Sequence, residues 1–261
     1  MGLLSETPGF NALPMEQNTS KKIRRRGIYL LPNLFTTAAL FAGFYAITSA
    51  MNGQFEAAAI AIFVAMVLDG LDGRVARLTN TQSAFGAEYD SMSDMISFGA
   101  APALVLYAWV LSGLGKAGWV AVFVHAAGAA LRLARFNTQL ATQDKRYFQG
   151  LPSPSAAAIL AGFLWVAVKY ELPTDKLGYI ALGLALTTGF LMVSNFRYSS
   201  FKDVDPHGRV SFLWATVVVL VFALLFINPP LVLFTCFSLY AISGPILTLI
   251  GRRRRRGERR V

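Results

Sequence analysis

The chain has 261 residues, of which 55% are hydrophobic and 15% are charged, and its formal net charge is +10. An ordinary soluble domain carries about 25% charged residues, so the composition excludes that class. Several apolar stretches reach the roughly 20 residues that a helix needs to cross a membrane, and none alternates as an outer-membrane barrel strand does. The composition therefore predicts an all-α, polytopic membrane bundle.

Apolar runs and the breaks between them predict eight transmembrane helices. The breaks contain turn formers such as Asn52-Gly53 and Asn228-Pro229-Pro230. In chain order the expected helices span residues 31–50, 54–77, 87–113, 117–138, 153–170, 178–197, 209–227 and 230–250. His125 lies alone in the fourth apolar stretch, so we expect it to make a hydrogen bond between helices.

The expected segments of the chain differ in charge. Residues 1–27 are expected to be a cytoplasmic, partly disordered segment that ends in a basic stretch, residues 28–200 the main membrane domain, residues 201–250 additional transmembrane helices, and residues 251–261 a basic tail. Arginines beside a membrane bind anionic headgroups, and the tail lacks the interleaved aromatic residues that stack on bases. We therefore expect anionic lipids, and no nucleic acid, as partners of this tail.

The basic residues indicate the orientation. An even number of spans puts both termini on one side, and that side would hold 21 of the 24 lysines and arginines, all except Lys116, Lys169 and Lys176. The side that is richer in lysine and arginine is normally the cytoplasm. Both termini are therefore expected to be cytoplasmic.

A polar run between the second and third expected helices contains four aspartates: Asp69, Asp72, Asp90 and Asp94. At about 100° per residue, the first two share a helical face with Gly73 and Ala76, and the other two share a face with Gly86. Two facing helices would bring four carboxylates together, and such repulsion costs several kcal/mol unless a cation cancels it. The spacing predicts a site for a hard divalent cation.

The same residues form the pattern Asp-x2-Asp-Gly-x2-Ala-Arg-x8-Gly-x3-Asp-x3-Asp, which resembles the signature of the CDP-alcohol phosphatidyltransferase family. All eight fixed positions match. The resemblance implies a six-helix catalytic core and an enzyme that displaces CMP from a CDP-linked lipid by an alcohol. Phosphoryl transfer of this kind requires neutralisation of the pyrophosphate charge, and two divalent cations, Mg²⁺ or Mn²⁺, fit ligation by carboxylates alone.

The resemblance also implies a role for each position of the pattern. Asp69, Asp72 and Asp90 would be metal ligands. Asp94 would be a further ligand or the general base, that is, a catalytic residue that takes the proton of the alcohol. The substrate CDP-diacylglycerol would contact four residues, with Gly73, Ala76 and Gly86 around cytidine and ribose and Arg77 at the pyrophosphate.

Residues 132–137, 148–154 and 191–198 resemble the bacterial, integral-membrane members of this family that use L-serine as the acceptor alcohol. The resemblance implies an enzyme of the bacterial inner membrane, a cytoplasmic active site and a homodimer. Serine carries a carboxylate, so its pocket should offer a cation near the metals. Arg132, Arg135 and Lys202, all expected at cytoplasmic helix ends, are the candidates.

Two alternatives stay open. Another member of the family, with glycerol 3-phosphate or inositol phosphate as acceptor, would also need cations and could use Arg132 and Arg135. A divalent-cation transporter would use membrane aspartates as well, but it would place them near the bilayer midplane on several helices. The clustering of the acids at one edge favours the enzyme.

Overall fold

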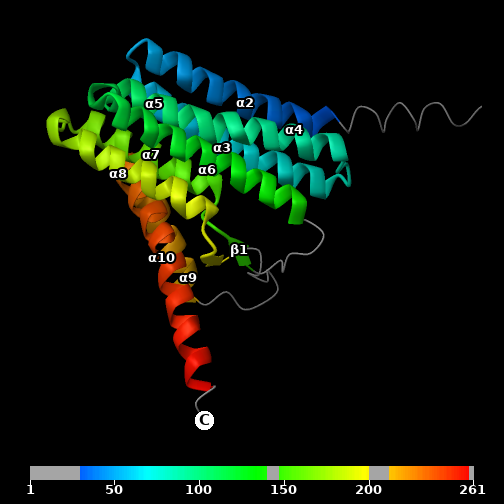
Figure 1. Cartoon of the computed structure of the whole chain (residues 1–261). Coiled ribbons are helices and arrows are strands. Elements are labelled where there is room, and N and C mark those ends of the chain that lie inside the picture. Colours follow the sequence, from blue (N-terminus) through cyan, green and yellow to red (C-terminus); the bar gives the residue numbers. More distant parts are fainter. Residues whose placement is uncertain (1–29, 140–146, 200–211, 259–261) are drawn as a thin grey trace, which may run out of the picture.

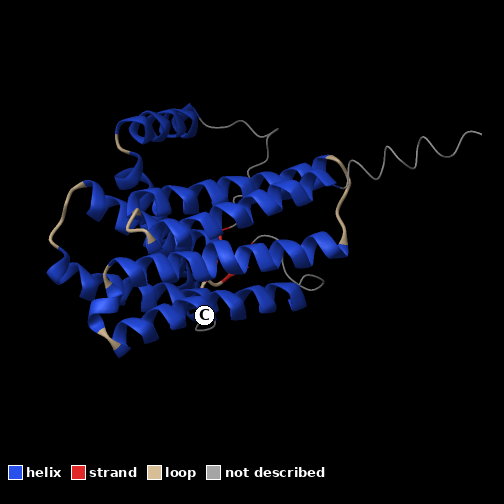
Figure 2. Cartoon of the chain, turned by 90° about the horizontal axis from the view of Figure 1, so that it is seen from above, coloured by secondary structure: helices blue, strands red, loops and turns tan. Residues whose placement is uncertain are grey.

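The computed structural model describes residues 30–139, 147–199 and 212–258, and nearly all of this part of the chain is helix (Figures 1 and 2). The long helices are α2 (Leu30–Met51), α3 (Phe55–Leu78), α4 (Ala84–Asp94), α5 (Ala101–Trp109), α6 (Lys116–Gln139), α7 (Ser153–Lys169), α8 (Thr174–Val193), α9 (Phe212–Ile227) and α10 (Pro229–Glu258). Two short strands, β1 (Tyr147–Gln149) and β2 (Arg197–Ser199), pair antiparallel, with Phe148 opposite Tyr198. The chain is an all-α membrane type of fold with one small ladder.

Four of the described helices are long and apolar enough to cross a membrane: Pro32–Met51, Lys116–Thr138, Thr174–Val193 and Pro229–Leu249. Helix α7 and the stretch Thr216–Ile227 are apolar but shorter. These helices support an integral membrane protein. Eight spans, a six-helix core and cytoplasmic termini remain predictions.

The third expected helix, 87–113, is not a single regular helix. It begins earlier, at Ala84, where the Ser83 side chain accepts a hydrogen bond from the Gly86 amide (3.0 Å) and caps the first turn. A π-helical turn, η1 (Met95–Ala100), joins α4 to α5, and a 3₁₀ turn, η2 (Leu111–Leu114), follows. A π turn contains one extra residue, so it changes which side chains face inward after Asp94.

Helix α8 also differs from its expected range, 178–197. It begins at Thr174, directly after Pro173, and ends at Val193, because the residues that follow turn into β2. The backbone is extended at Ser194, directly after the helix, and β2 then pairs with β1, a segment distant in the sequence.

Small residues form the contact between α2 and α3, which lie side by side (Figure 1). The buried alanines of this contact are Ala42, Ala46 and Ala50 on α2 and Ala58, Ala61 and Ala65 on α3. Lipid tails are as apolar as side chains, so helices in a membrane associate through close packing rather than through the hydrophobic effect. The two helices therefore meet on their smallest side chains.

Helices α6 and α8 meet at Gly128 and Gly189. A Cβ atom added at Gly189 would lie 2.7 Å from the Val124 carbonyl oxygen, and one added at Gly128 would lie 2.6 Å from that of Gly189. One turn away, the buried His125 bridges three elements, with Nδ1 at 2.8 Å from Thr188 Oγ1 and Nε2 at 3.3 Å from the Phe98 carbonyl in η1. The predicted interhelical role of His125 is confirmed.

Gly189→Ala should therefore destabilise the protein by about 1–3 kcal/mol, the usual cost of overpacking. Gly183→Ala is the matched control on the same helix, because a Cβ there meets nothing within 4 Å. Thermal unfolding in detergent should show a lower midpoint for Gly189→Ala alone. Equal midpoints for the two variants would contradict the close contact of α6 with α8.

Candidate active site

Four aspartates converge where the end of α3 faces α4. Asp69 and Asp72 come from the last turns of α3, and Asp90 and Asp94 from successive turns of α4. Asp69, Asp72 and Asp90 each contribute one carboxylate oxygen to a compact set. These three oxygens lie within 4.8 Å of one another. Asp94 lies beside this set and interacts electrostatically with Asp69 and Asp90. The structure thus has the convergence that helical periodicity predicted.

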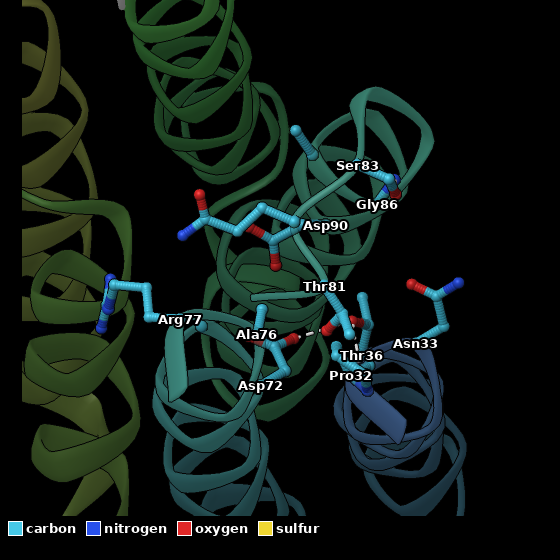
Figure 3. A pocket seen from close by; sticks show the side chains of 13 residues that line it. Pro32, Asn33, Thr36, Asp72, Ala76, Arg77, Thr81, Ser83, Gly86 and Asp90 are labelled. Atoms are coloured by element: carbon cyan, nitrogen blue, oxygen red, sulfur yellow. Dashed lines mark hydrogen bonds between the residues drawn. The ribbon is translucent and has the colours of Figure 1, made fainter. Parts of the chain in front are cut away.

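Hydrogen bonds from serine and threonine hydroxyl groups connect α2 to the helices that carry the four aspartates. Thr36 Oγ1 donates a hydrogen bond to Asp72 Oδ2 at 2.8 Å (Figure 3), and the Ser93 hydroxyl donates to the Thr36 carbonyl at 3.1 Å. One turn further, Ser97 donates to the Ala39 carbonyl, also at 3.1 Å. These bonds join α2 to α3 and α4 and orient Asp72. Sequence reasoning missed Thr36, although a polar residue four positions after Pro32 in an apolar run is a usable signal.

The carboxylates suit a hard cation. Asp90 Oδ1 and Asp94 Oδ1 are buried and have no hydrogen-bond partner among the residues that the structure describes. A buried charge without a partner is costly, and a divalent cation would remove that cost. The donors are all carboxylate oxygens, which fit Mg²⁺ or Mn²⁺, whereas zinc sites normally recruit histidine or cysteine. The residues present therefore fit a divalent metal.

A pocket of about 250 Å³ opens beside the carboxylates. Its walls are the start of α2, the end of α3, residues 81–83 and the first turns of α4, and Asp72 of α3 and Asp90 of α4 are among its lining residues (Figure 3). All four residues that the signature implied for CDP-diacylglycerol line it: Gly73, Ala76, Arg77 and Gly86. Sequence reasoning did not assign the lining residues Pro32, Asn33, Thr36, Thr81, Gln82, Ser83 and Ala87 to it.

The glycines of the pocket are not equivalent. A Cβ at Gly86 would lie 3.1 Å from Ser83 Oγ and 3.5 Å from Asn33 Oδ1, so the protein itself restricts this position. A Cβ at Gly73 meets nothing within 4 Å, so no protein contact requires glycine there. A ligand that approaches the backbone closely at position 73 would explain the glycine, because any side chain there would occupy the space of the ligand.

Gly73→Ala should weaken binding of the CDP-linked lipid that the signature implies roughly tenfold or more, because the added methyl group would occupy ligand space. Gly70→Ala is the control: it lies in the same helix, also has nothing within 4 Å and does not line the pocket. Both variants should keep or slightly raise the thermal midpoint, because alanine favours helix by about 1 kcal/mol. Equal affinities of the two variants for that lipid would contradict close approach of a nucleotide at Gly73.

The arginine and lysine side chains that the sequence predicted for substrate binding lie in different surroundings. Arg132 on α6 donates from Nη1 to Ser153 Oγ at 3.0 Å and interacts electrostatically with Asp94. Arg135 donates from Nη1 to the Val193 carbonyl at 3.1 Å, at the end of α8. Arg77 is exposed at the pocket edge, where its side chain extends away from Thr36 (Figure 3). Lys202 lies outside the described residues. Arg132, one of the residues predicted to bind the acceptor alcohol, is thus brought to the carboxylates by the fold.

Apolar spans, a carboxylate cluster and an adjoining pocket define a helical membrane protein with a divalent-metal type of site. The chain belongs to the CDP-alcohol phosphatidyltransferase family, whose model matches residues 29–193. It contains every fixed residue of that family's signature at the site described above.

Several curated relatives carry one name, CDP-diacylglycerol–serine O-phosphatidyltransferase. The protein of Helicobacter pylori is 39% identical over 219 residues, which are 84% of this chain and 91% of that protein. The protein of Mycobacterium leprae is 32% identical and covers 87% of this chain and 78% of its own length. The protein of Methanocaldococcus jannaschii is 35% identical and covers 73% and 83%. The similarity thus spans bacterial and archaeal proteins and most of each chain.

Proposed function

We propose that this chain transfers the phosphatidyl group from CDP-diacylglycerol to L-serine and releases phosphatidylserine and CMP. The observation that carries the proposal is the carboxylate cluster beside a pocket whose lining includes six residues of the family signature: Asp72, Gly73, Ala76, Arg77, Gly86 and Asp90. The names of the relatives support serine as the acceptor. The excess of basic residues on one predicted side supports a cytoplasmic site in the bacterial inner membrane.

In this proposal Asp69, Asp72 and Asp90 hold two divalent cations, Mg²⁺ or Mn²⁺, with Asp94 as a further ligand or as the base. Bound cations would supply neutralisation of the charge that develops on the pyrophosphate during phosphoryl transfer. Gly73, Ala76 and Gly86 leave room for the cytidine and ribose, and Arg77 pairs with the pyrophosphate.

The chemical step forms a bond between the serine hydroxyl oxygen and the phosphorus that carries diacylglycerol. The bond from this phosphorus to the oxygen of CMP breaks, and CMP leaves with that oxygen. Asp94 accepts the proton of the serine hydroxyl, and Arg132 binds the serine carboxylate beside it. Arg135 and Lys202 are further proposed contacts of the acceptor, and the enzyme is proposed to act as a homodimer.

Incorporation of radiolabelled acceptors tests this function. The purified protein in vesicles with CDP-diacylglycerol and Mg²⁺ or Mn²⁺ should convert labelled L-serine to a lipid and release CMP in equal amount. Glycerol 3-phosphate and inositol phosphate serve as competing acceptors in parallel reactions. Incorporation of glycerol phosphate without serine would overturn the proposed acceptor, and metal flux without CMP release would favour a transporter.

Arg132→Ala should raise the KM for L-serine by about tenfold or more, the effect of losing a charge-assisted hydrogen bond, while the KM for CDP-diacylglycerol changes less. Lys116→Ala removes one positive charge from an exposed position at the start of α6 and is the control. Steady-state kinetics with each substrate varied in turn provide both constants. If the two constants rise equally, the carboxylate of serine binds elsewhere.

A further inference from the structure

Helix α10 lies beyond residues 29–193, which the family model matches, yet it packs directly on the catalytic part of the chain. A Cβ atom at Gly162 on α7 would lie 3.1 Å from the Phe234 Cα atom of α10. Near its other end, Thr248 Oγ1 accepts a hydrogen bond from the Arg197 amide of β2 at 3.0 Å. Figure 1 shows α10 starting beside α7 and α8 and running past the strands. The helix is thus held at two points.

Tyr198 of β2 determines the position of α10 between these points. Its side chain is fully buried, and its hydroxyl donates to the Ala241 carbonyl at 3.0 Å. A Cβ atom at Gly244 would overlap the Tyr198 ring, so the backbone of α10 lies directly against this ring. The register of α10 around residue 240 is therefore set by Tyr198.

This register brings Tyr240 to Arg132. The Tyr240 ring is tilted against that of Tyr198, with centroids 5.5 Å apart, and it packs against the buried cluster that contains Ala129, one turn before Arg132 on α6. Tyr240 and Arg132 also interact electrostatically. On its other side Arg132 donates from Nη1 to the buried Ser153. Arg132 Nε is buried and has no hydrogen-bond partner within the described ranges.

A buried guanidinium N–H without a partner is costly, so it points to a ligand. A guanidinium presents two parallel N–H groups along each edge, and a carboxylate can accept both. Ser153 already occupies Nη1, whereas Nε remains for such a ligand. Arg132 also interacts with Asp94, so a ligand on it would lie beside the carboxylates.

We propose that α10 completes the acceptor subsite of this enzyme, with Tyr240 and Ser153 as positioning residues that hold Arg132 so that Nε binds the acceptor's carboxylate. The inference rests on the proposed function for the identity of the acceptor. It adds that Tyr240, which lies outside the matched family segment, contributes to how tightly that acceptor binds. Tyr240 acts through Arg132 and does not itself react.

A double-mutant cycle in the full-length chain tests this proposal. Tyr240→Phe keeps the ring on Tyr198 and removes the hydroxyl, and it should raise the KM for L-serine about tenfold, with kcat and the KM for CDP-diacylglycerol nearly unchanged. In the Arg132→Ala background the same change should have little further effect, because coupled residues are not additive. Ser153→Ala should behave like Tyr240→Phe. Tyr45→Phe, which removes the hydroxyl of an exposed tyrosine on α2, is the control.

An unchanged KM for serine in both Tyr240→Phe and Ser153→Ala would overturn the proposal, and so would an equal rise with and without Arg132. A rise in both substrate constants together with a lower thermal midpoint would show a structural role and would also overturn it. If the unaltered chain incorporates another acceptor but not serine, the proposed function is overturned. The proposal that Arg132 binds the carboxylate of the acceptor is then overturned as well. If serine is incorporated, only the cycle decides.

Discussion

Replacing Asp90 by asparagine should lower kcat/KM by about a thousandfold or more, which corresponds to roughly 4 kcal/mol of transition-state stabilisation. The reason is that Asp90 supplies one of the three oxygens that lie within 4.8 Å of one another, and asparagine has no charge with which to hold a cation. The same substitution at Asp72 should act alike, and it would also replace the charged acceptor of the Thr36 hydrogen bond by a neutral amide oxygen.

Thermal unfolding provides a second measurement that does not depend on activity. A ligand that binds only the folded state raises the unfolding midpoint, so Mg²⁺ or Mn²⁺ should stabilise the unaltered protein. Asp90→Asn should lose most of that rise. Without metal, the variant should unfold at an equal or higher temperature, because one of four neighbouring negative charges is gone.

Glu88→Gln is the matched control for Asp90→Asn. Glu88 lies on the same helix two residues earlier, is exposed and does not line the pocket. It should retain both activity and the metal-dependent rise. An active Asp90→Asn variant with an undiminished rise would exclude Asp90 as a metal ligand.

Asp94→Asn should lower kcat at saturating substrates by about a hundredfold or more, the usual contribution of a general base. Asp94 lies beside the compact set of three oxygens, its Oδ1 is buried without a hydrogen-bond partner among the described residues, and Arg132 is near it. A carboxylate in this place can take a proton from an alcohol held beside Arg132 and the three other aspartates. Asparagine cannot.

The metal-dependent rise in the unfolding midpoint separates the two roles of Asp94. As the base alone, Asp94→Asn should keep most of the rise while kcat falls. As a ligand, it should lose the rise as Asp90→Asn does, and excess Mn²⁺ should restore part of the activity. Unchanged turnover at saturating substrate would exclude Asp94 as the base.

The aspartate cluster could be predicted because its spacing is local. Residues three or four positions apart share a helical face whatever surrounds the helix, so Asp69 with Asp72 and Asp90 with Asp94 had to lie together in pairs. The short Leu78–Ala84 connection then makes the two faces neighbours. The same periodicity puts Gly73, Ala76 and Gly86 on these faces, and all three line the pocket.

The interruption of the third helix could not be predicted in this way. Hydropathy is continuous through Met95–Ala100, whereas the π turn there makes hydrogen bonds to other helices. Ser97 donates to the Ala39 carbonyl, and His125 lies at the Phe98 carbonyl. These partners are 58 and 27 positions away in the sequence.

By itself, the sequence determined that this is a helical membrane protein, where most helices run and that four carboxylates face one another, because hydropathy and the 3.6-residue period are properties of local sequence. The tertiary structure decided which groups surround those carboxylates. Thr36 on Asp72, Ser153 on Arg132 and Tyr240 beside Arg132 all join segments that are far apart in the chain. Close packing at small residues brings these segments together, and no local pattern encodes such a pairing.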